Sequence, residues 1–468
     1  MRAVAVCLSF FLVMLDSTIV TVALPSIGGG TATLQWVVDA YTVVFAALVL
    51  AGGSLADRFG ARRAYRAGVM IFTLGSIMCA GSGTASAWLI AGRVVQGVGA
   101  AVLMPSSLAL IRSTYPEPAT QARIIGLWGG LGGVAAAAGP LLGGALLSVA
   151  GWPALFLLNV PFAVLVLVVS GGLVDPPVVP GARVDVRGVV TSTCGLALLV
   201  AGCIAHRADL VAGGALVLGL FVALQRGALQ RRALQSRRPA SMLRPDLLRH
   251  RALRATVITG FALNFGFYGQ FFLVTLYLQQ QRHLSPLLTG VALAVQAAGA
   301  VVGSPFGGWA THRSGPRTTM LIGLLTGAAG FVALALCASG PLPAVLAALF
   351  VIGFGIDTAM TAATSLTLQV APDGHAGVAS GLLNTMRQVG SALGVAVLGA
   401  IGGFATAVLI AAGTYLAAAV LVALRTAAPG TTAPGTAAPG TAAPALPATP
   451  APPAPPAVPR ARRIGGSS

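Results

Sequence analysis

The chain has 468 residues, of which 56% are hydrophobic and only 8% are charged, and its formal net charge is +18. A water-soluble fold of this length would not stay dispersed with so few charges, so the composition excludes a soluble protein and predicts a membrane protein. The chain contains no lysine, which excludes a Walker A nucleotide site and a Schiff base with retinal or pyridoxal phosphate.

Long apolar runs recur from Ala3 to Leu424. At roughly 18 to 25 residues, each run can cross a hydrocarbon layer about 30 Å thick as an α-helix. The predicted fold is therefore an all-α polytopic membrane protein with 14 transmembrane helices. They are expected at 3–24, 36–55, 66–83, 87–111, 123–148, 153–173, 188–205, 210–225, 254–278, 288–310, 318–338, 343–368, 378–400 and 403–424. The first run follows Arg2 as a signal peptide would, but Asp16 interrupts it, so we expect it to be retained.

The arginines are distributed unevenly around these spans. If the N-terminus is cytoplasmic, all but four of the 28 fall at cytoplasmic loops, at the helix ends beside them or in the tail. Arg207 and Arg282 fall on the other side, and Arg93 and Arg387 lie within spans. This asymmetry follows the positive-inside rule. We therefore place both termini in the cytoplasm and attribute the positive charge to the membrane rather than to nucleic acid.

The most basic segment is the predicted cytoplasmic loop between the eighth and ninth spans. From Arg226 to Arg254 it carries nine arginines against the single Asp246. Such a segment is expected to lie along anionic lipid headgroups at the cytoplasmic face. Docking of a partner protein is the alternative interpretation.

A repeat with an offset of 255 residues divides the chain into related halves. The repeated residues are Gly53, Arg58, Gly60 and Arg62, which recur as Gly308, Arg313, Gly315 and Arg317. Many secondary transporters consist of two such halves around a site at the bilayer midplane. The expected organisation is a six-helix bundle at 1–174, an inserted two-helix hairpin at 175–225, a basic cytoplasmic loop at 226–253, a second six-helix bundle at 254–425 and a disordered Ala/Pro/Gly/Thr-rich cytoplasmic tail at 426–468.

The first copy of the repeated loop holds Asp57 among three arginines. We expect Gly53 and Gly60 to provide a close backbone approach or a positive φ in a short turn between two helices. Arg58 would keep the turn at the cytoplasmic face, and Asp57 would favour the start of the third helix. We interpret the loop as a latch for one arrangement of the two halves. The alternative is that it only stabilises the turn.

The segment Gly53-Ser-Leu-Ala-Asp-Arg-Phe-Gly-Ala-Arg-Arg63 resembles the signature loop of the major facilitator superfamily, with Ala61 where an arginine is usual. Further segments resemble the fourteen-helix drug:proton antiporter branch of that family. They are Leu15–Pro25, Gln35–Tyr41, Arg93–Gly99, Tyr277–Gln279 with Ser285–Leu287, and Gly377–Gly390. The chain departs from its relatives at Gly151-Trp-Pro-Ala154, where Gly-Trp-Arg-Trp is usual.

The fifth span carries a glycine-rich stretch around Gly139 and Pro140. Together with Gly126, Gly143 and Gly144, these residues are spaced like the antiporter motif of the family, with Ala135 at the position of another glycine. Small residues let a neighbouring helix approach closely, and Pro140 removes one helical hydrogen bond. The resemblance implies a bent helix that shapes the cavity, restricts leak and is associated with export.

Three charged residues in the first half are candidates for proton coupling. A charge at the centre of an inserted helix costs about 2.5–3.5 kcal/mol, so each needs a reason. Asp16 lies near mid-depth and would lose its charge on protonation, which indicates a proton or cation site; a structural hydrogen bond is the alternative. Arg93 matches the intramembrane arginine of the family and stays charged, so the resemblance implies that it acts on a nearby carboxylate, unless it snorkels to the outer interface. Asp39 matches the family's Trp-Val-x-Asp-Ala-Tyr pattern and is interpreted as a proton-access or substrate-entry group, or as a wet interfacial residue.

Polar residues in the second half are candidates for a substrate cavity. Asn264 and Tyr268 lie one turn apart in the ninth span, while Asn384 and Arg387 belong to one polar face of the thirteenth. A polar stripe on a membrane helix is expected to look into a cavity or a helix contact rather than at lipid. Asp357 stands where relatives usually carry glycine, and we expect it to face substrate or to pair with Arg387.

The sequence therefore predicts a proton-coupled antiporter that exports small lipophilic compounds, such as drugs or antibiotics, across the cytoplasmic membrane by alternating access. A metabolite importer of the same fold and a non-transporting membrane sensor are the alternatives. An enzyme is not expected, because no nucleophile–base–acid set appears. No cofactor or metal site is expected, since the five cysteines fall singly in apolar spans and the histidines are not clustered. The expected partners are a small-molecule substrate, protons and anionic lipids, with the protein acting as a monomer.

Overall fold

A computed structural model of the chain describes residues 2–175, 185–234, 251–370 and 376–425, and every regular element in these ranges is helical. The described helices belong to one unit, Met1–Ala427. Most of the predicted basic loop and the whole predicted tail lie outside the described residues, as does the side chain of Asp57. An all-helical chain is expected in lipid, because a helix satisfies its backbone hydrogen bonds within one segment.

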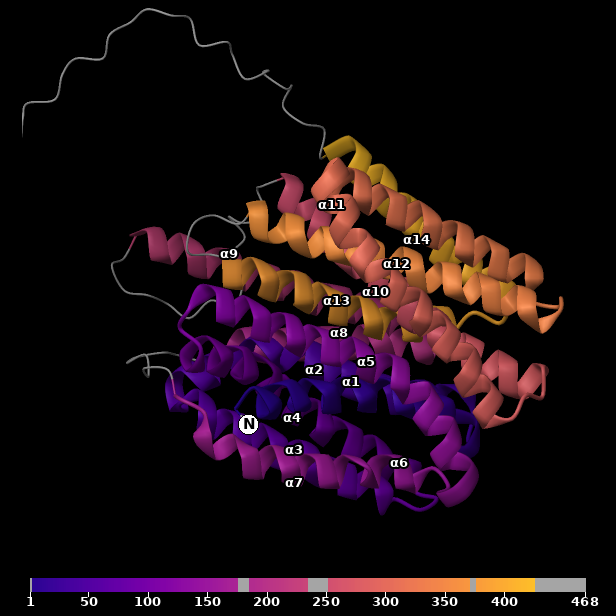
Figure 1. Ribbon diagram of the computed structural model, residues 1–468, viewed down its shortest axis with the longest axis horizontal. Coiled ribbons are helices and arrows are strands. Elements are labelled where there is room, and N and C mark those ends of the chain that lie inside the picture. The colour runs from indigo at the N-terminus through magenta and orange to yellow at the C-terminus, as the bar shows by residue number, and fades with distance from the viewer. Residues whose placement is uncertain (1, 176–184, 235–250, 371–375, 426–468) are drawn as a thin grey trace, which may run out of the picture. The chain divides into compact units, whose positions relative to one another are not determined.

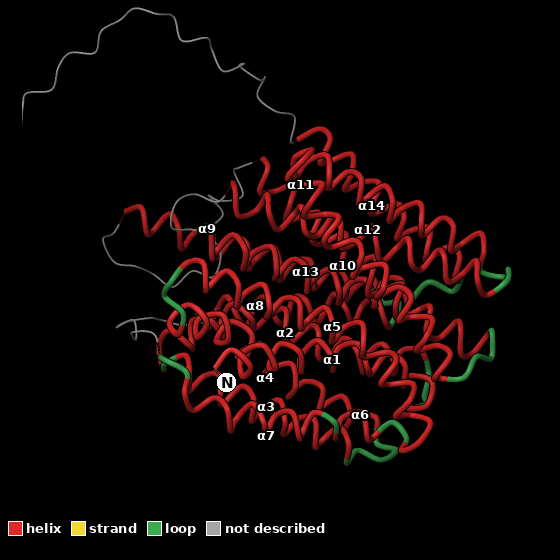
Figure 2. Tube along the Cα trace, in the orientation of Figure 1, coloured by secondary structure: helices red, strands yellow, loops and turns green. Residues whose placement is uncertain are grey.

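The helices of the first half are joined by short loops (Figure 2). They are α1 (Arg2–Ile27), α2 (Thr31–Phe59), α3 (Ala61–Ala80), α4 (Ser86–Thr114), α5 (Pro118–Ala150), α6 (Pro153–Leu157), α7 (Asn159–Val169) and η1 (Ser170–Gly172). The predicted sixth span is broken at Leu158 into α6 and α7. Pro161 explains the break, because it has no N–H to donate to the carbonyl of Leu157.

The described parts of the inserted hairpin and of the second half are also helical. Their elements are α8 (Val186–Ile204), α9 (Ala208–Leu234), α10 (Arg251–Leu276), η3 (Tyr277–Gln281), α11 (Pro286–Cys337), α12 (Leu342–Val370), α13 (Ala376–Gly399) and α14 (Phe404–Arg425). Helix α11 contains two predicted spans, 288–310 and 318–338, which meet at a kink at Gly315.

The two repeated glycines have similar backbone conformations. Gly60, between α2 and α3, has φ 92°, and Gly315, within α11, has φ 81°. A residue with a side chain is strained at such values, so glycine is required at both turns. The expectation for Gly53 is wrong, because α2 continues through it and a Cβ there would meet only an ordinary contact with Pro105. The close backbone approach falls instead at Gly52, against the carbonyl of Ala101.

Among the described residues, 11 helices are long and apolar enough to cross a membrane. One of them is α11, which covers two predicted spans, and the helices α3 and α13 occupy the remaining two. A helix therefore lies at each segment that the sequence predicts to be a span.

The helices of the two halves form separate buried clusters. The largest cluster comes almost wholly from α10–α14, and the next comes from α1–α7 with the following turn. Figure 1 shows these groups on opposite sides, with α2 and α8 next to α13 between them. A further cluster joins α2, α8 and α13, so the hairpin packs where the two halves meet.

Candidate functional site

A buried ion pair forms the centre of the site. Arg93 of α4 donates from Nη1 to Oδ2 of Asp16 in α1 at 2.6 Å. Gln96 and Asn159 donate to the other carboxylate oxygen, at 3.0 Å and 2.7 Å. None of the Asp16 surface is exposed. A buried ion pair is stable only when further hydrogen bonds complete it, and these two amides supply them.

Ser76 of α3 completes this charge network, which we define as Asp16, Arg93, Gln96, Asn159 and Ser76. Ser76 accepts hydrogen bonds from Gln96 at 2.8 Å and from Asn159 at 3.1 Å. Arg93 also donates from Nη1 to Oε1 of Gln96 at 2.9 Å, and it makes two contacts with α2. Its Nε donates to the carbonyl of Val37 at 2.9 Å, and its guanidinium carbon lies 4.4 Å from the centroid of the Tyr41 ring.

The charge network settles part of the geometry that the sequence left open. The carboxylate near Arg93 is that of Asp16, and Arg93 is 1% exposed, so the snorkelling alternative is wrong. Gln96 belongs to the segment Arg93–Gly99, which resembles the family, but the sequence contains no reason to single it out from the rest of that segment. Asn159 and Ser76 were missed, although each is a polar residue in an apolar run, which was the available signal.

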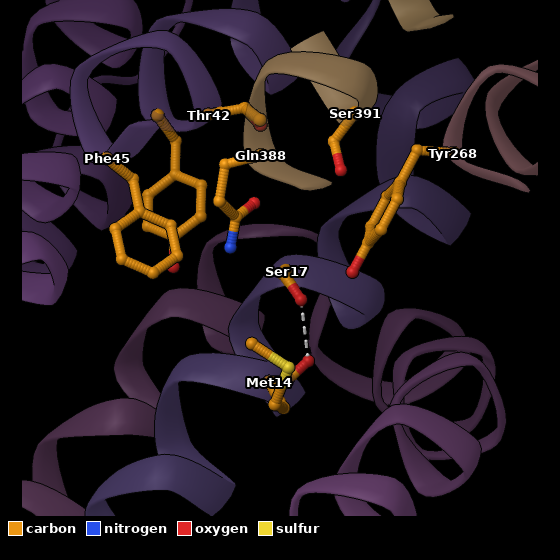
Figure 3. A pocket seen from close by; sticks show the side chains of 8 residues that line it. Met14, Ser17, Thr42, Phe45, Tyr268, Gln388 and Ser391 are labelled. Carbon is orange, nitrogen blue, oxygen red and sulfur yellow. Dashed lines mark hydrogen bonds between the residues drawn. The ribbon is translucent and has the colours of Figure 1, made fainter. Parts of the chain in front are cut away.

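A cavity lies between the halves on the opposite face of α1. It is lined by Met14, Ser17, Tyr41, Thr42, Phe45, Tyr268, Gln388 and Ser391, and in this structure it is narrow, with room for about one water molecule. The described lining contains no carboxylate, guanidinium or imidazole. Figure 3 shows the rings of Phe45 and Tyr268 on opposite sides, with the side chain of Gln388 directed into the space between them. The Ser17 hydroxyl donates to the carbonyl of Met14 at 2.8 Å.

Of the residues predicted to line a substrate cavity, some lie at this cavity and others do not. Tyr268 lines the cavity, and Asn264 donates to Ser391 Oγ at 3.1 Å behind the lining. Asp357, Asn384 and Arg387 are partly buried but are not among the lining residues. The stem of Arg387 runs instead against α10, where its Cγ would lie 3.2 Å from a Cβ at Gly260.

Asp357 and Arg387 do not form the expected ion pair. The ion pairs among the described residues join Asp16 to Arg93, Arg62 to Asp175, and Arg207 to Asp209. The charges of Asp357 and Arg387 still act on each other and on Tyr268 of the cavity. The interpretation that Asp357 faces substrate stays a prediction.

Asp39 is buried in α2 and is not the wet residue of the alternative interpretation, because it has no exposed surface. Neither carboxylate oxygen has a hydrogen-bond partner within the described part of the chain. Trp36 and Val43, about one turn to either side, pack in the cluster that joins α2 to α8 and α13. Burial by the hairpin and α13 was not visible from the position of Asp39 near a span end.

The residues of the predicted latch lie mostly on helix α2, which ends only at Phe59. Gly60 alone forms the turn, and the exposed Arg58 lies over the Phe59 ring at 5.2 Å. The backbone N–H of Arg62 donates to Asp175 at 2.6 Å, and the two side chains approach to 3.5 Å. Asp175, at the far end of the first half, is an acid that the sequence did not single out.

Helix α5 packs against both halves at the predicted antiporter motif. A Cβ at Gly139 would collide with the Thr18 hydroxyl of α1, and the carbonyl of Pro140 lies against Gly290 of α11. A Cβ at Gly144 would lie 2.6 Å from the carbonyl oxygen of Pro286. Small residues therefore allow α5 to touch α1 and α11 at once.

Two glutamines also connect the halves, near the α1–α2 and α10–α11 connections. Gln35 donates to the carbonyls of Val395 and Ala396, each at 3.1 Å, and Gln279 donates to the carbonyl of Val22 at 2.9 Å. Both belong to segments that resemble the family, but neither was a predicted site residue. We call these two residues the glutamine clasp.

Comparison with known proteins gives concordant matches. The model of the Major Facilitator Superfamily matches residues 6–395 and 256–461. The methylenomycin A resistance protein of Bacillus subtilis is 32% identical over 448 residues, which cover 91% of this chain and 94% of the relative. The tetracenomycin C resistance and export protein of Streptomyces glaucescens is 33% identical over 84% of this chain and 74% of the relative. The crystal structure of a POT family transporter in complex with a thioalcohol-conjugated peptide has the same fold, with a TM-score of 0.66, 14% identity and coverage of 90% of this chain and 93% of that one.

Proposed function

Because the chain belongs to the Major Facilitator Superfamily, as its motifs predicted, we propose that it exports small lipophilic compounds across the cytoplasmic membrane in exchange for protons. The chain is a multi-pass membrane transporter and not an enzyme. Relatives named for resistance to methylenomycin A and for resistance to and export of tetracenomycin C support export of such compounds.

The observation that carries this proposal is the buried Asp16–Arg93 pair beside an uncharged cavity. Proton uptake at Asp16 would break the ion pair, while Arg93 keeps its charge in both states. A carboxylate held by three donors is therefore a site at which one proton changes the packing of α1, α4 and α7. One unit of pH difference would supply about 1.4 kcal/mol per proton to drive export.

The proposed topology has 14 transmembrane helices in a six, two and six arrangement, with both termini in the cytoplasm. Helices at all predicted segments support the count, and the arginine distribution supports the orientation. The bundles are assigned to 1–174 and 254–425, the inserted hairpin to 175–225, and contact with anionic lipids to the basic loop at 226–253. The protein is proposed to act as a monomer.

Alternating access would require the contacts between the halves to break on one side and form on the other. The glutamine clasp and the α5–α11 contact at Pro140 tie the halves beside the loops that the topology places outside. This pattern supports assignment of the structure to a state closed to the outside. Gly139 and Pro140 are assigned to this gate, and Asp57, Arg58 and Gly60 to the cytoplasmic latch.

The test is transport by the purified protein in liposomes with an imposed pH gradient. The panel contains methylenomycin A and tetracenomycin C, for which the relatives are named, and the cation ethidium. We expect wild-type protein to move at least one panel compound against the proton flux, and Asp16→Asn to abolish this movement.

Asp209→Asn is the matched control, because Asp209 is an exposed acid paired only with Arg207 at a loop. It should transport like wild type, and both variants must elute as folded protein. Movement of compound in the same direction as protons would favour the importer, and full activity of Asp16→Asn would refute a role for Asp16 in coupling.

A further inference from the structure

Tyr41 contacts both the charge network and the cavity. It is 3% exposed, it lines the cavity, and its ring carries the Arg93 guanidinium at 4.4 Å. The same helix holds Arg93 from one turn earlier, through the carbonyl of Val37. Helix α2 therefore contacts the cation of the ion pair at two places and presents one of them, an aromatic ring, to the cavity.

The ring of Tyr41, and not its hydroxyl, makes these contacts. The hydroxyl is buried and has no hydrogen-bond partner among the described residues. A cation is attracted to the face of an aromatic ring by the negative charge density there. The Tyr41 ring therefore attracts Arg93 without a hydrogen bond between these two residues. Phe45 lies one turn further along α2, with its ring 5.9 Å from that of Tyr41, and it also lines the cavity.

Few ionisable groups face Asp16 from the helices packed around it. They are Arg93 from α4, Tyr41 from α2 and Cys79 from α3, while α7 contributes the neutral Asn159. Tyr268 of α10 lies across the cavity and acts on Tyr41, and the stretch of α5 around Gly139, which packs on Thr18 of α1, has no ionisable side chain. Arg93 is therefore the counter-charge in direct contact with Asp16.

We propose that Tyr41 is the positioning residue through which a ring-bearing substrate in the cavity stabilises the ionised Asp16–Arg93 pair. This inference rests on the proposed antiport. A flat substrate between the rings of α2 and Tyr268 fixes the Tyr41 ring beneath the guanidinium, and the guanidinium then holds Asp16 in its carboxylate form. The O–H bond of Asp16 breaks and its proton passes to water, while Arg93, Gln96 and Asn159 retain the carboxylate.

Thermodynamic linkage makes this effect reciprocal. If substrate favours loss of the proton, then protonation of Asp16 must weaken substrate binding by the same factor. Wherever binding releases one full proton, substrate affinity should rise about tenfold for each unit of pH. A purely structural role for Tyr41 would change affinity without changing this slope.

The experiment measures the dissociation constants of the panel compounds for the full-length protein in nanodiscs, from about pH 5.5 to pH 8.5, together with proton release in weak buffer. Wild type should bind more tightly as pH rises and should release a proton on binding. Tyr41→Leu should bind with a flattened pH dependence and little proton release. Tyr41→Phe should keep the wild-type slope, since the ring remains.

Phe45→Leu is the matched control, because it removes a cavity ring that carries no guanidinium. It should weaken binding by a similar factor at every pH and keep the slope. A fluorinated phenylalanine at position 41 keeps the shape of the ring but reduces the charge density on its face, so it should flatten the slope without a packing defect. This variant tests the proposal even if Tyr41→Leu does not fold.

Asp16→Asn separates the two proposals. If Asp16→Asn retains the pH dependence of binding, the proposed antiport through Asp16 fails. If Asp16→Asn loses that dependence while Tyr41→Leu and the fluorinated variant keep it, only the role of Tyr41 is overturned. Absence of binding by all panel compounds would overturn both.

Discussion

Replacement of Arg93 by methionine is the sharpest test of the charge network. Methionine has an unbranched side chain like the aliphatic part of arginine, but it lacks the guanidinium group. The substitution therefore removes the hydrogen bonds to Asp16, Gln96 and the Val37 carbonyl, at 2.6, 2.9 and 2.9 Å. Asp16 would keep two neutral donors and lose its counter-charge. Removal of one partner of a buried ion pair costs about 3–5 kcal/mol, so we expect Arg93→Met to destabilise the protein by that amount.

The double variant with Asp16→Asn makes the prediction specific. Asp16→Asn alone leaves the Arg93 charge buried without a carboxylate, so it should also be destabilising. With both changes no unpaired charge remains, and the double variant should be more stable than Arg93→Met alone. Reversible unfolding by SDS in mixed micelles, followed by circular dichroism, gives the three free-energy differences.

The control for this cycle is Arg207→Met. Arg207 also pairs with an aspartate, but both side chains are 61% exposed. We expect no measurable change in stability, since exposed ion pairs contribute little. Strictly additive effects of Arg93→Met and Asp16→Asn would refute the view that Asp16 and Arg93 depend on each other for their burial.

Three further predictions concern packing, closure and topology. Gly99→Ala would place a Cβ against the backbone of α3 and should lower the free energy of unfolding by about 1–3 kcal/mol in the same assay. Gly129→Ala should leave it unchanged, because a Cβ there meets nothing within 4 Å. Equal effects of the two substitutions would contradict the assigned packing. Gln35→Leu removes two hydrogen bonds of the glutamine clasp and should increase hydrogen exchange in the last turns of α13; unchanged exchange would show that the clasp does not hold this end closed. In a cysteine-free background, a membrane-impermeant maleimide should label Thr84→Cys in intact cells but Ser314→Cys only after lysis, and the reverse pattern would invert the proposed orientation.

The helices could be predicted from sequence because a membrane-spanning helix needs a continuous apolar run of a known length. Their ends were less certain, since they depend on single residues. Gly60 and Gly315 stop or kink a helix through a positive φ, while Gly53 does not, and the sequence pattern alone treated them alike. Pro161 breaks the sixth predicted segment, an effect that hydrophobicity does not report.

The charge network was predictable one residue at a time but not as a set. Asp16 and Arg93 stood out because charges are rare in apolar runs, yet their pairing joins residues 77 positions apart. Ser76 and Asn159 are neutral, so an apolar run tolerates them and gives little signal. Asp357 and Arg387 stood out equally, but their charges interact without forming an ion pair.

The placement of Asp16 and of the cavity on opposite faces of α1 bears on how such a transporter diversifies. Met14, Phe45 and Gln388 can be exchanged without loss of any hydrogen bond to the Asp16 carboxylate. Selection by a new toxic compound can therefore change the residues that line the cavity while the Asp16–Arg93 pair stays unchanged. Within the described part of the chain, α1 contributes residues to both sites and α2 contacts both. Substitutions in these two helices can therefore widen the substrate range at the expense of proton coupling.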